Sequence, residues 1–287
     1  MKKLSLLMVV VLIMGLTGCA ASHPTPRIMA TTKPVYDFTT YLCEGTNLSV
    51  GLLIDESVSC LHDYSLSVGQ VRNAEGAELI VISGAGLEEF MDDLLADRSN
   101  VIDSSFGISL PACTVEHDHD HHHEIDSHIW LSPAYAAQMA ENIYTGLRTA
   151  YPEHTITFQK NLAKLREDLQ ALQEYGQTQL QDLSCREMVT FHDGFGHFAH
   201  AFDLTIAAAM EEESGSEASA KELIHLIELI QERNIPAIFT EVNGSASAAK
   251  IISAEIDIPG YALDMGMTGD YFEIMKRNID TVKEALG

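Results

Sequence analysis

Positive charge is scarce in this chain: 17 Lys and Arg stand against 42 Asp and Glu among 287 residues, which gives a formal net charge of −25 with His neutral. A surface this acidic repels phosphate backbones and argues against sequence-independent binding to nucleic acid. Long hydrophobic runs are missing too, since none reaches the roughly 20 residues that a membrane-spanning helix needs. Hydrophobic residues still make up 46% of the chain, the composition of a folded globular protein rather than a disordered one.

Several enzyme motifs are also absent. The chain has no Gly-x-Ser-x-Gly nucleophile elbow and no P-loop. The nearest match to the zinc-protease motif HExxH is His123-Glu124-Ile125-Asp126-Ser127, in which Ser127 takes the place of the second His. We therefore predict that the protein is not an enzyme, and a zinc hydrolase is the weaker alternative. An adhesin is a third alternative, and no stripe of aromatic residues supports it directly.

No two cysteines form a CxxC pair, which excludes a zinc ribbon and a thioredoxin-type motif. Four cysteines besides Cys19 allow three disulfide pairings, which the sequence does not separate. Cys60 lies two residues before His62, and we interpret it as a disulfide partner or a buried thiol rather than a metal ligand. The four are Cys43, Cys60, Cys113 and Cys185.

The start of the chain indicates export. Two lysines precede an apolar run from Leu4 to Leu16, the pattern of a secretory signal. The segment Leu16-Thr17-Gly18-Cys19 resembles a bacterial lipobox, which implies cleavage before Cys19 and acylation of that cysteine. We therefore expect residues 1–18 to be a signal peptide and residues 19–26 a tether. The mature protein would be exported and lipid-anchored to the bacterial cell membrane, facing outward.

Strand-like and helix-like segments alternate in two sets along the rest of the chain. Such alternation predicts parallel sheets covered by helices on both faces. Between the two sets, apolar residues recur at spacings of three and four from Phe158 to Tyr175, the mark of one long amphipathic helix. Short buried strands are expected at 27–31, 48–54, 79–82 and 101–102, and again at 188–191, 204–208, 237–240 and 261–263.

These segments predict an α/β protein of two lobes, each a mainly parallel sheet flanked by helices, joined by one long connecting helix. The expected N-terminal lobe is 27–152, the connecting helix 153–184 and the C-terminal lobe 185–287. Within the N-terminal lobe, residues 116–124 contain five histidines, a density for which loose metal capture is the usual reason. We predict an auxiliary metal-binding loop made of His117, His119, His121, His122 and His123.

Four other side chains stand near strand ends, where α/β proteins bind ligands. His62 comes after the strand that ends at residue 54, and His128 lies just ahead of a helix. His192 and Asp264 each follow the carboxyl end of a strand in the second set. Because two of these residues belong to each lobe, a metal ion bound by all four would lie in the cleft between the lobes.

The segments that carry these residues are His62-Asp63-Tyr64-Ser65-Leu66, Asp126-Ser127-His128-Ile129-Trp130-Leu131-Ser132-Pro133 and Phe191-His192-Asp193-Gly194-Phe195-Gly196, with a tail from Leu263 to Asn278. Together they resemble the metal-binding lipoproteins of ABC transporters for zinc and manganese, over nearly the whole mature chain. The resemblance implies two αβ lobes joined by a rigid helix. Its implied metal ligands are His62, His128, His192 and Asp264. Ser127 departs from the family, which usually has Pro there.

The predicted ligand set favours zinc over manganese. Three imidazoles and one carboxylate suit four-coordinate Zn²⁺, whereas Mn²⁺ prefers more oxygen donors. Manganese-type members of the family carry Glu where His192 stands. The fourth ligand stays open between Asp264, water and Glu241. Ligating histidines usually donate their other N–H to an acceptor, and we expect Asp126, Asp193 and Glu241 to play that part.

The resemblance implies a function and a partner. We predict an extracytoplasmic solute-binding lipoprotein that captures Zn²⁺ in the interlobe cleft and delivers it to a membrane permease of the ABC type. We expect it to work as a monomer. A manganese-type binding protein of the same family is the alternative.

Overall fold

The computed structural model describes residues 26–55, 61, 64–110, 126–210 and 219–287. Within these ranges the chain forms two four-stranded sheets in which every strand pair is parallel. The first sheet has the order β2-β1-β3-β4 and the second the order β6-β5-β7-β8. The strands are β1 Ile28–Ala30, β2 Val50–Leu52, β3 Leu79–Ile82, β4 Val101–Asp103, β5 Glu187–Thr190, β6 Thr205–Ala209, β7 Ile238–Glu241 and β8 Gly260–Leu263.

Both sheets reverse their strand order at an inner strand. β1 is paired with β2 on one side and β3 on the other, and β5 is paired in the same way with β6 and β7. In such open sheets a crevice forms at the carboxyl ends of the strands on either side of the reversal, and ligands bind there. The topology therefore gives two candidate ligand crevices, one at the β1/β3 junction and one at the β5/β7 junction.

The helices begin at residues whose local chemistry favours a start. Ser67 and Ser219 each form a capping box, with Gln70 and Glu222 as the reciprocal partners. Pro34 and Pro133 occupy first-turn positions, where a missing N–H costs nothing. The helices are α2 Lys33–Cys43, α3 Val68–Gly76, α4 Asp92–Leu95, α5 Pro133–Ala150, α6 Thr155–Gln179, α7 Gly196–Ala201, α8 Ala220–Arg233, α9 Ser247–Ile256 and α10 Tyr271–Leu286, with short 3-10 turns η1 Glu89–Met91, η2 Ile129–Leu131 and η3 Pro152–His154.

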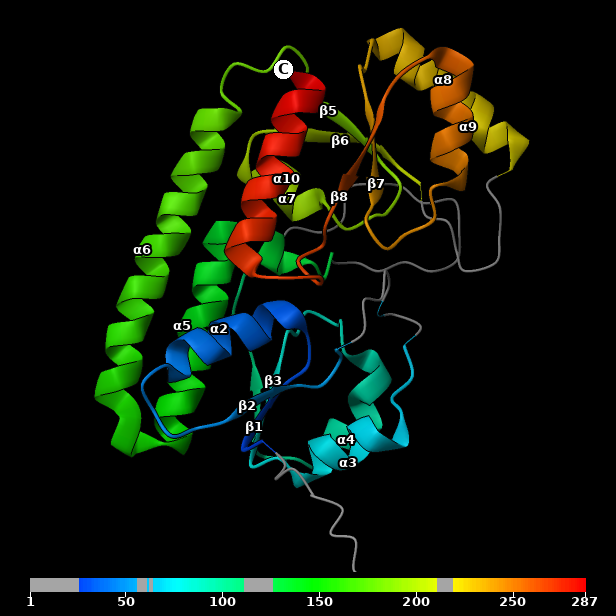
Figure 1. Cartoon of the computed structure of the whole chain (residues 1–287). Coiled ribbons are helices and arrows are strands. Elements are labelled where there is room, and N and C mark those ends of the chain that lie inside the picture. Colours follow the sequence, from blue (N-terminus) through cyan, green and yellow to red (C-terminus); the bar gives the residue numbers. More distant parts are fainter. Residues whose placement is uncertain (1–25, 56–60, 62–63, 111–125, 211–218) are drawn as a thin grey trace, which may run out of the picture.

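The predicted long helix is α6, which runs along one side of the molecule past both sheets (Figure 1). Its apolar residues, among them Phe158, Leu165 and Leu172, are buried on one face, as the spacing predicts. That face packs against α2 and α5 from the first half of the chain and against α10 from the end of the chain. The predicted two-lobe α/β fold is confirmed, while the residue boundaries of the lobes stay a prediction.

The hydrophobic core does not stop at the boundary between the lobes. One continuous cluster of buried side chains extends from Ile28 in β1 to Leu286 in α10, and it includes Trp130 and Tyr271. A second, smaller cluster lies between the second sheet and the helices α8 and α9. Separating the lobes would therefore expose apolar surface, at a cost of roughly 25 cal/mol per Å².

Several predictions concern residues outside the described ranges. Residues 1–18, Cys19, the His-rich loop, Cys60 and Cys113 all lie there, so the predictions made for them stay predictions. Cys43 and Cys185 are described, and both are free thiols. Burial raises the pKa of Cys43 to about 12, so this thiol is neutral and unsuited to metal binding at neutral pH. Among the described helices, none has the length and apolar character needed to span a bilayer.

Candidate metal centre

His128 is held by a carboxylate from its own segment. Its Nδ1 lies 2.9 Å from Asp126 Oδ1, and its backbone N–H donates to the same oxygen at 2.9 Å. Burial raises the pKa of Asp126, but its hydrogen bonds from His128 and its electrostatic interactions with His128 and His197 outweigh burial and lower the pKa to about 2. An ionised Asp126 facing Nδ1 leaves Nε2 as the ring nitrogen that would bind a metal ion.

His192 lies at the β5/β7 junction, two residues beyond the end of β5. Its Nδ1 is 3.8 Å from Oε2 of Glu241, the last residue of β7, and both side chains are buried. Burial, and then the charge of Asp264, raise the pKa of Glu241 to about 8. Nδ1 of His192 therefore faces a carboxyl group, as Nδ1 of His128 does, but at a longer distance.

The two histidines meet although they come from different halves of the chain. Their ring centroids are 5.2 Å apart and the rings are nearly perpendicular, at 84°. Gly194 lies between them, because a Cβ built there would come within 2.8 Å of both His128 Nδ1 and His192 Cδ2. It would also collide with the methyl group of Met265, the residue after Asp264. Three segments thus converge on one backbone position, where any side chain would force these neighbours to shift.

Asp264 is buried and surrounded by donors. Its Oδ1 accepts from the backbone N–H groups of Gly266 at 2.9 Å and Met267 at 3.2 Å. Its Oδ2 accepts from the Thr268 hydroxyl and, at 3.3 Å, from the Arg277 guanidinium. A carboxylate has about four acceptor positions. Direct coordination of a metal ion by Asp264 would therefore replace one of these donors, most simply Thr268 or Arg277.

Not every predicted site residue is brought to this place by the described structure. His62 lies outside the described ranges, between Leu61, which is buried in the core, and Tyr64. Asp193 is half-buried in the turn that follows His192. Within the described part of the chain, no three His, Cys, Asp or Glu side chains lie close enough together to hold a metal ion. His128 and His192 therefore do not form such a group with either Asp264 or Glu241, and the ligand set, His62 included, stays a prediction.

The sequence analysis missed Glu88, which occupies the β1/β3 junction of the first sheet. Its Oε1 accepts from the Thr31 hydroxyl at 2.6 Å and the Ser83 N–H at 2.7 Å, and its Oε2 accepts from the Gly84 N–H at 2.9 Å. Burial raises the pKa of this carboxyl to about 7. The only available signal was an acid six residues beyond a buried strand, and one acid in a chain with 42 does not stand out.

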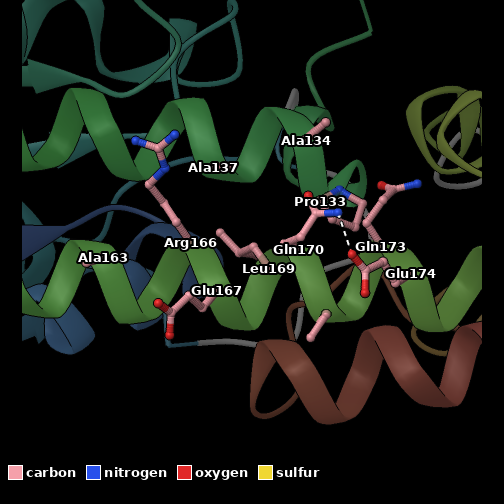
Figure 2. A pocket seen from close by; sticks show the side chains of 11 residues that line it. Pro133, Ala134, Ala137, Ala163, Arg166, Glu167, Leu169, Gln170, Gln173 and Glu174 are labelled. Atoms are coloured by element: carbon pink, nitrogen blue, oxygen red, sulfur yellow. Dashed lines mark hydrogen bonds between the residues drawn. The ribbon is translucent and has the colours of Figure 1, made fainter.

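A surface groove of about 630 Å³ lies between α5 and α6 (Figure 2). Its lining includes the small side chains of Ala134 and Ala137 and the polar side chains of Arg166, Gln170 and Glu174. Gln170 Nε2 donates to Glu174 Oε1 at 2.9 Å within it. None of His128, His192 and Asp264, the predicted ligands that the structure describes, lines this groove.

Comparison of the sequence with known protein families shows which family this chain belongs to. The sequence model of the family described as "Zinc-uptake complex component A periplasmic" matches residues 28–285. The chain belongs to this family. Its members are metal-binding components of transport systems rather than enzymes, which confirms the predicted family and the prediction that the protein is not an enzyme.

Individual relatives agree with this membership. The zinc-binding lipoprotein AdcA of Streptococcus pneumoniae is 30% identical over 99% of this chain and 61% of its own length. The chain thus spans about three-fifths of the length of such curated relatives. A crystal structure of ZnuA superposes with a TM-score of 0.81 at 27% identity, covering 91% of this chain and 98% of that one. A ZnuA deletion mutant with zinc bound gives a TM-score of 0.78 at 27% identity, over 91% and 97% of the two chains.

Proposed function

We propose that this protein is an extracytoplasmic lipoprotein that captures Zn²⁺ between its lobes and delivers it to an ABC permease for import. One observation carries the proposal: His128 and His192, from opposite halves of the chain, meet with ring centroids 5.2 Å apart. The Nδ1 of each ring faces a carboxyl group, the half-buried Asp126 or the buried Glu241. Metal-binding histidines have this arrangement, because the outer carboxylate fixes the tautomer and orients the ring.

The chemistry of the donors favours zinc. His62, His128 and His192 would supply three imidazole nitrogens, and a fourth ligand would come from Asp264, Glu241 or water. Nitrogen-rich four-coordinate sites suit Zn²⁺, and oxygen-rich sites suit Mn²⁺. Asp126, Glu241 and Asp193 are the proposed outer partners of the histidines. Two relatives, AdcA and the ZnuA mutant, are described as zinc-binding or zinc-bound, which supports the same choice.

The remaining parts of the proposal concern where the protein works. The signal peptide and Cys19 would place it outside the cytoplasm on a lipid anchor, next to its permease. The relatives named as lipoproteins support this location. The His-rich loop would bind further zinc weakly and raise its local concentration. We propose that a single copy of the chain suffices for binding, because ligands from both lobes of one chain complete the site.

Capture and release follow from the nature of the ligands. Imidazole binds a metal ion only when neutral, so zinc affinity falls as the pH drops through the histidine range near 6.5. At constant pH, release requires the ligands of the two lobes to separate. A permease that pulls the lobes apart would weaken the site in this way.

The proposal is tested by titrating the metal-free protein with Zn²⁺ in competition with a chelating dye. We expect one tight equivalent per chain, with weaker equivalents from the His-rich loop. A second titration with Mn²⁺ present in large excess should leave the tight equivalent unchanged. Absence of a tight equivalent would contradict metal capture, and displacement by Mn²⁺ would favour the manganese-type alternative.

A further inference from the structure

The loop that follows Asp264 is fastened to the opposite lobe close to His128. Trp130, two residues beyond His128 in η2, donates its indole N–H to the backbone carbonyl of Met265 at 2.6 Å. Met265 is the residue directly after Asp264. The Trp130 ring also contacts the His128 ring edge to face, with centroids 5.4 Å apart. The buried Trp130 side chain thus contacts His128, a predicted ligand from one lobe. It also donates a hydrogen bond to the residue next to Asp264, a predicted ligand from the other lobe.

The other end of the same loop is fastened as well. Tyr271, the first residue of α10, donates its hydroxyl to the backbone carbonyl of Trp130 at 2.7 Å. Its backbone N–H donates to Asp37 Oδ2 at 3.1 Å, and its ring packs edge to face on Phe38 at 4.8 Å. Both Asp37 and Phe38 belong to α2 of the first half of the chain. The segment 264–271 is therefore bound at both ends to the N-terminal half.

The backbone between these two anchors is shaped to allow the contact. Gly266 has a φ of +85°, a left-handed conformation that side chains other than glycine rarely adopt. A Cβ at this position would lie 3.3 Å from Trp130 Nε1, the atom that makes the interlobe hydrogen bond. Trp130 and Tyr271 are each at most 1% exposed. Loss of either donor would leave a buried carbonyl without its partner, which is costly.

We infer that Trp130 and Tyr271 form a hydrogen-bonded bridge between the lobes that positions His128 against the Asp264 loop and so controls how long the metal ion is retained. The inference rests on the proposed function, because it assigns positioning residues to that metal site. The lobes cannot separate at the site without breaking both bonds of the bridge. A permease that releases the ion would have to break them first.

The test compares two tyrosine-to-phenylalanine variants of the full chain. Tyr271→Phe removes the hydroxyl that bonds to Trp130. Tyr175→Phe is the matched control, because it also removes one tyrosine hydroxyl that donates to α10. The Tyr175 hydroxyl, on α6, donates to Asp280 Oδ1 at 2.6 Å, and this hydrogen bond is exposed to solvent. Both proteins are loaded with Zn²⁺, and its dissociation into excess chelating dye is followed by stopped flow. We expect dissociation from Tyr271→Phe to be about tenfold faster, the factor that one buried hydrogen bond supplies, and from Tyr175→Phe to be unchanged.

A spectroscopic measurement separates positioning from general stability. The visible absorption bands of bound Co²⁺ report the ligand geometry, and urea unfolding of the metal-free protein reports stability. Changed bands in Tyr271→Phe alone would support the bridge. Unaltered dissociation and unaltered bands, with only a lower urea midpoint, would overturn it. If Tyr271→Phe does not fold, Trp130→Phe, which keeps a smaller aromatic ring beside His128 and loses the indole N–H, is judged by the same two readouts.

The outcomes also distinguish this inference from the proposed function. If the unchanged protein binds no zinc tightly, the proposed function fails. If it binds zinc tightly and the bridge variants release it at the unchanged rate, only the bridge fails.

Discussion

The two sheets share one strand order, but the junction at the point of reversal is used differently in each. In the first sheet, Glu88 fills the β1/β3 junction and accepts three hydrogen bonds from Thr31, Ser83 and Gly84. In the second, the β5/β7 junction holds His192 facing Glu241 at 3.8 Å, with Asp264 close enough to raise the pKa of Glu241. At the β1/β3 junction, nearby donors satisfy the buried carboxyl group. At the β5/β7 junction, a histidine lies beside two buried carboxyl groups.

Under the proposed function, one topology serves packing in the first lobe and metal binding in the second. A buried carboxyl group is costly unless it is hydrogen-bonded, protonated or close to a cation. Glu88 meets this demand with donors from its own lobe. Glu241 faces Nδ1 of His192, and under the proposed function a metal ion would bind to Nε2 on the opposite side of that ring. We therefore expect substitutions at the second junction to change metal binding and substitutions at the first to change only stability.

The largest effect is expected from the histidines. His128→Ala and His192→Ala should each weaken zinc binding more than about 100-fold, beyond what loss of an outer partner usually costs. His62→Ala is expected to match them. Competition with a chelating dye measures all three. Glu88→Gln serves as the control at the other junction and should keep the affinity of the unchanged protein. Unchanged affinity in any one of the alanine variants would remove that residue from the site.

A smaller effect is expected from the carboxylates behind the rings. Asp126→Asn should lower zinc affinity by roughly 10- to 100-fold, because it weakens the partner of His128 at 2.9 Å. Glu241→Gln should lower it less, since its distance to His192 is 3.8 Å. The same titration ranks the two variants. A larger loss for Glu241→Gln would reverse the ranking and indicate that Glu241 binds the metal ion directly.

How far the sequence predicts this site depends on the kind of information each residue needs. His192 and Asp264 could be found because each directly follows a short apolar strand, a local pattern. The run Leu79–Ile82, entirely apolar, predicts a buried parallel strand in the same local way. Which strands lie side by side is not local, so the Glu88 junction could not be predicted. Glu241 could be predicted as the partner of a histidine, but not that the histidine it faces is His192. The donors around Asp264 depend on a loop conformation that no spacing indicates.

The ionisation of Glu88 should make the free energy of unfolding depend on pH. Its pKa is raised from 4.5 to about 7 in the folded protein, so the folded state keeps a proton that the unfolded state has already lost. This stabilisation of the folded state is complete at pH values below the pKa of Glu88 in the unfolded state. It falls as the pH rises towards the pKa of Glu88 in the folded state. Linkage gives a loss of about 2 kcal/mol between pH 5 and pH 7.

The measurement is the free energy of unfolding in urea across this pH range, for the metal-free protein and for Glu88→Gln. The difference between the two curves isolates Glu88 from the other acidic groups. We expect the variant to lack this part of the decline. Parallel curves would show that Glu88 is ionised in the folded state throughout, and that its three donors outweigh its burial.

The smallest effect is expected from the His-rich loop. Deleting residues 116–124 should leave the tight equivalent unchanged and remove only the weaker ones, because the predicted site uses none of these histidines. Isothermal titration with Zn²⁺ separates the two classes of binding. Loss of the tight equivalent would show that the loop takes part in the interlobe site.

The most direct measurement is native mass spectrometry, combined with elemental analysis, of the protein purified without added metal. We expect one zinc ion per chain in the unchanged protein and none in His128→Ala or His192→Ala, one variant from each half of the site. Retained manganese, or zinc retained equally by both variants, would contradict a zinc site built between the two lobes.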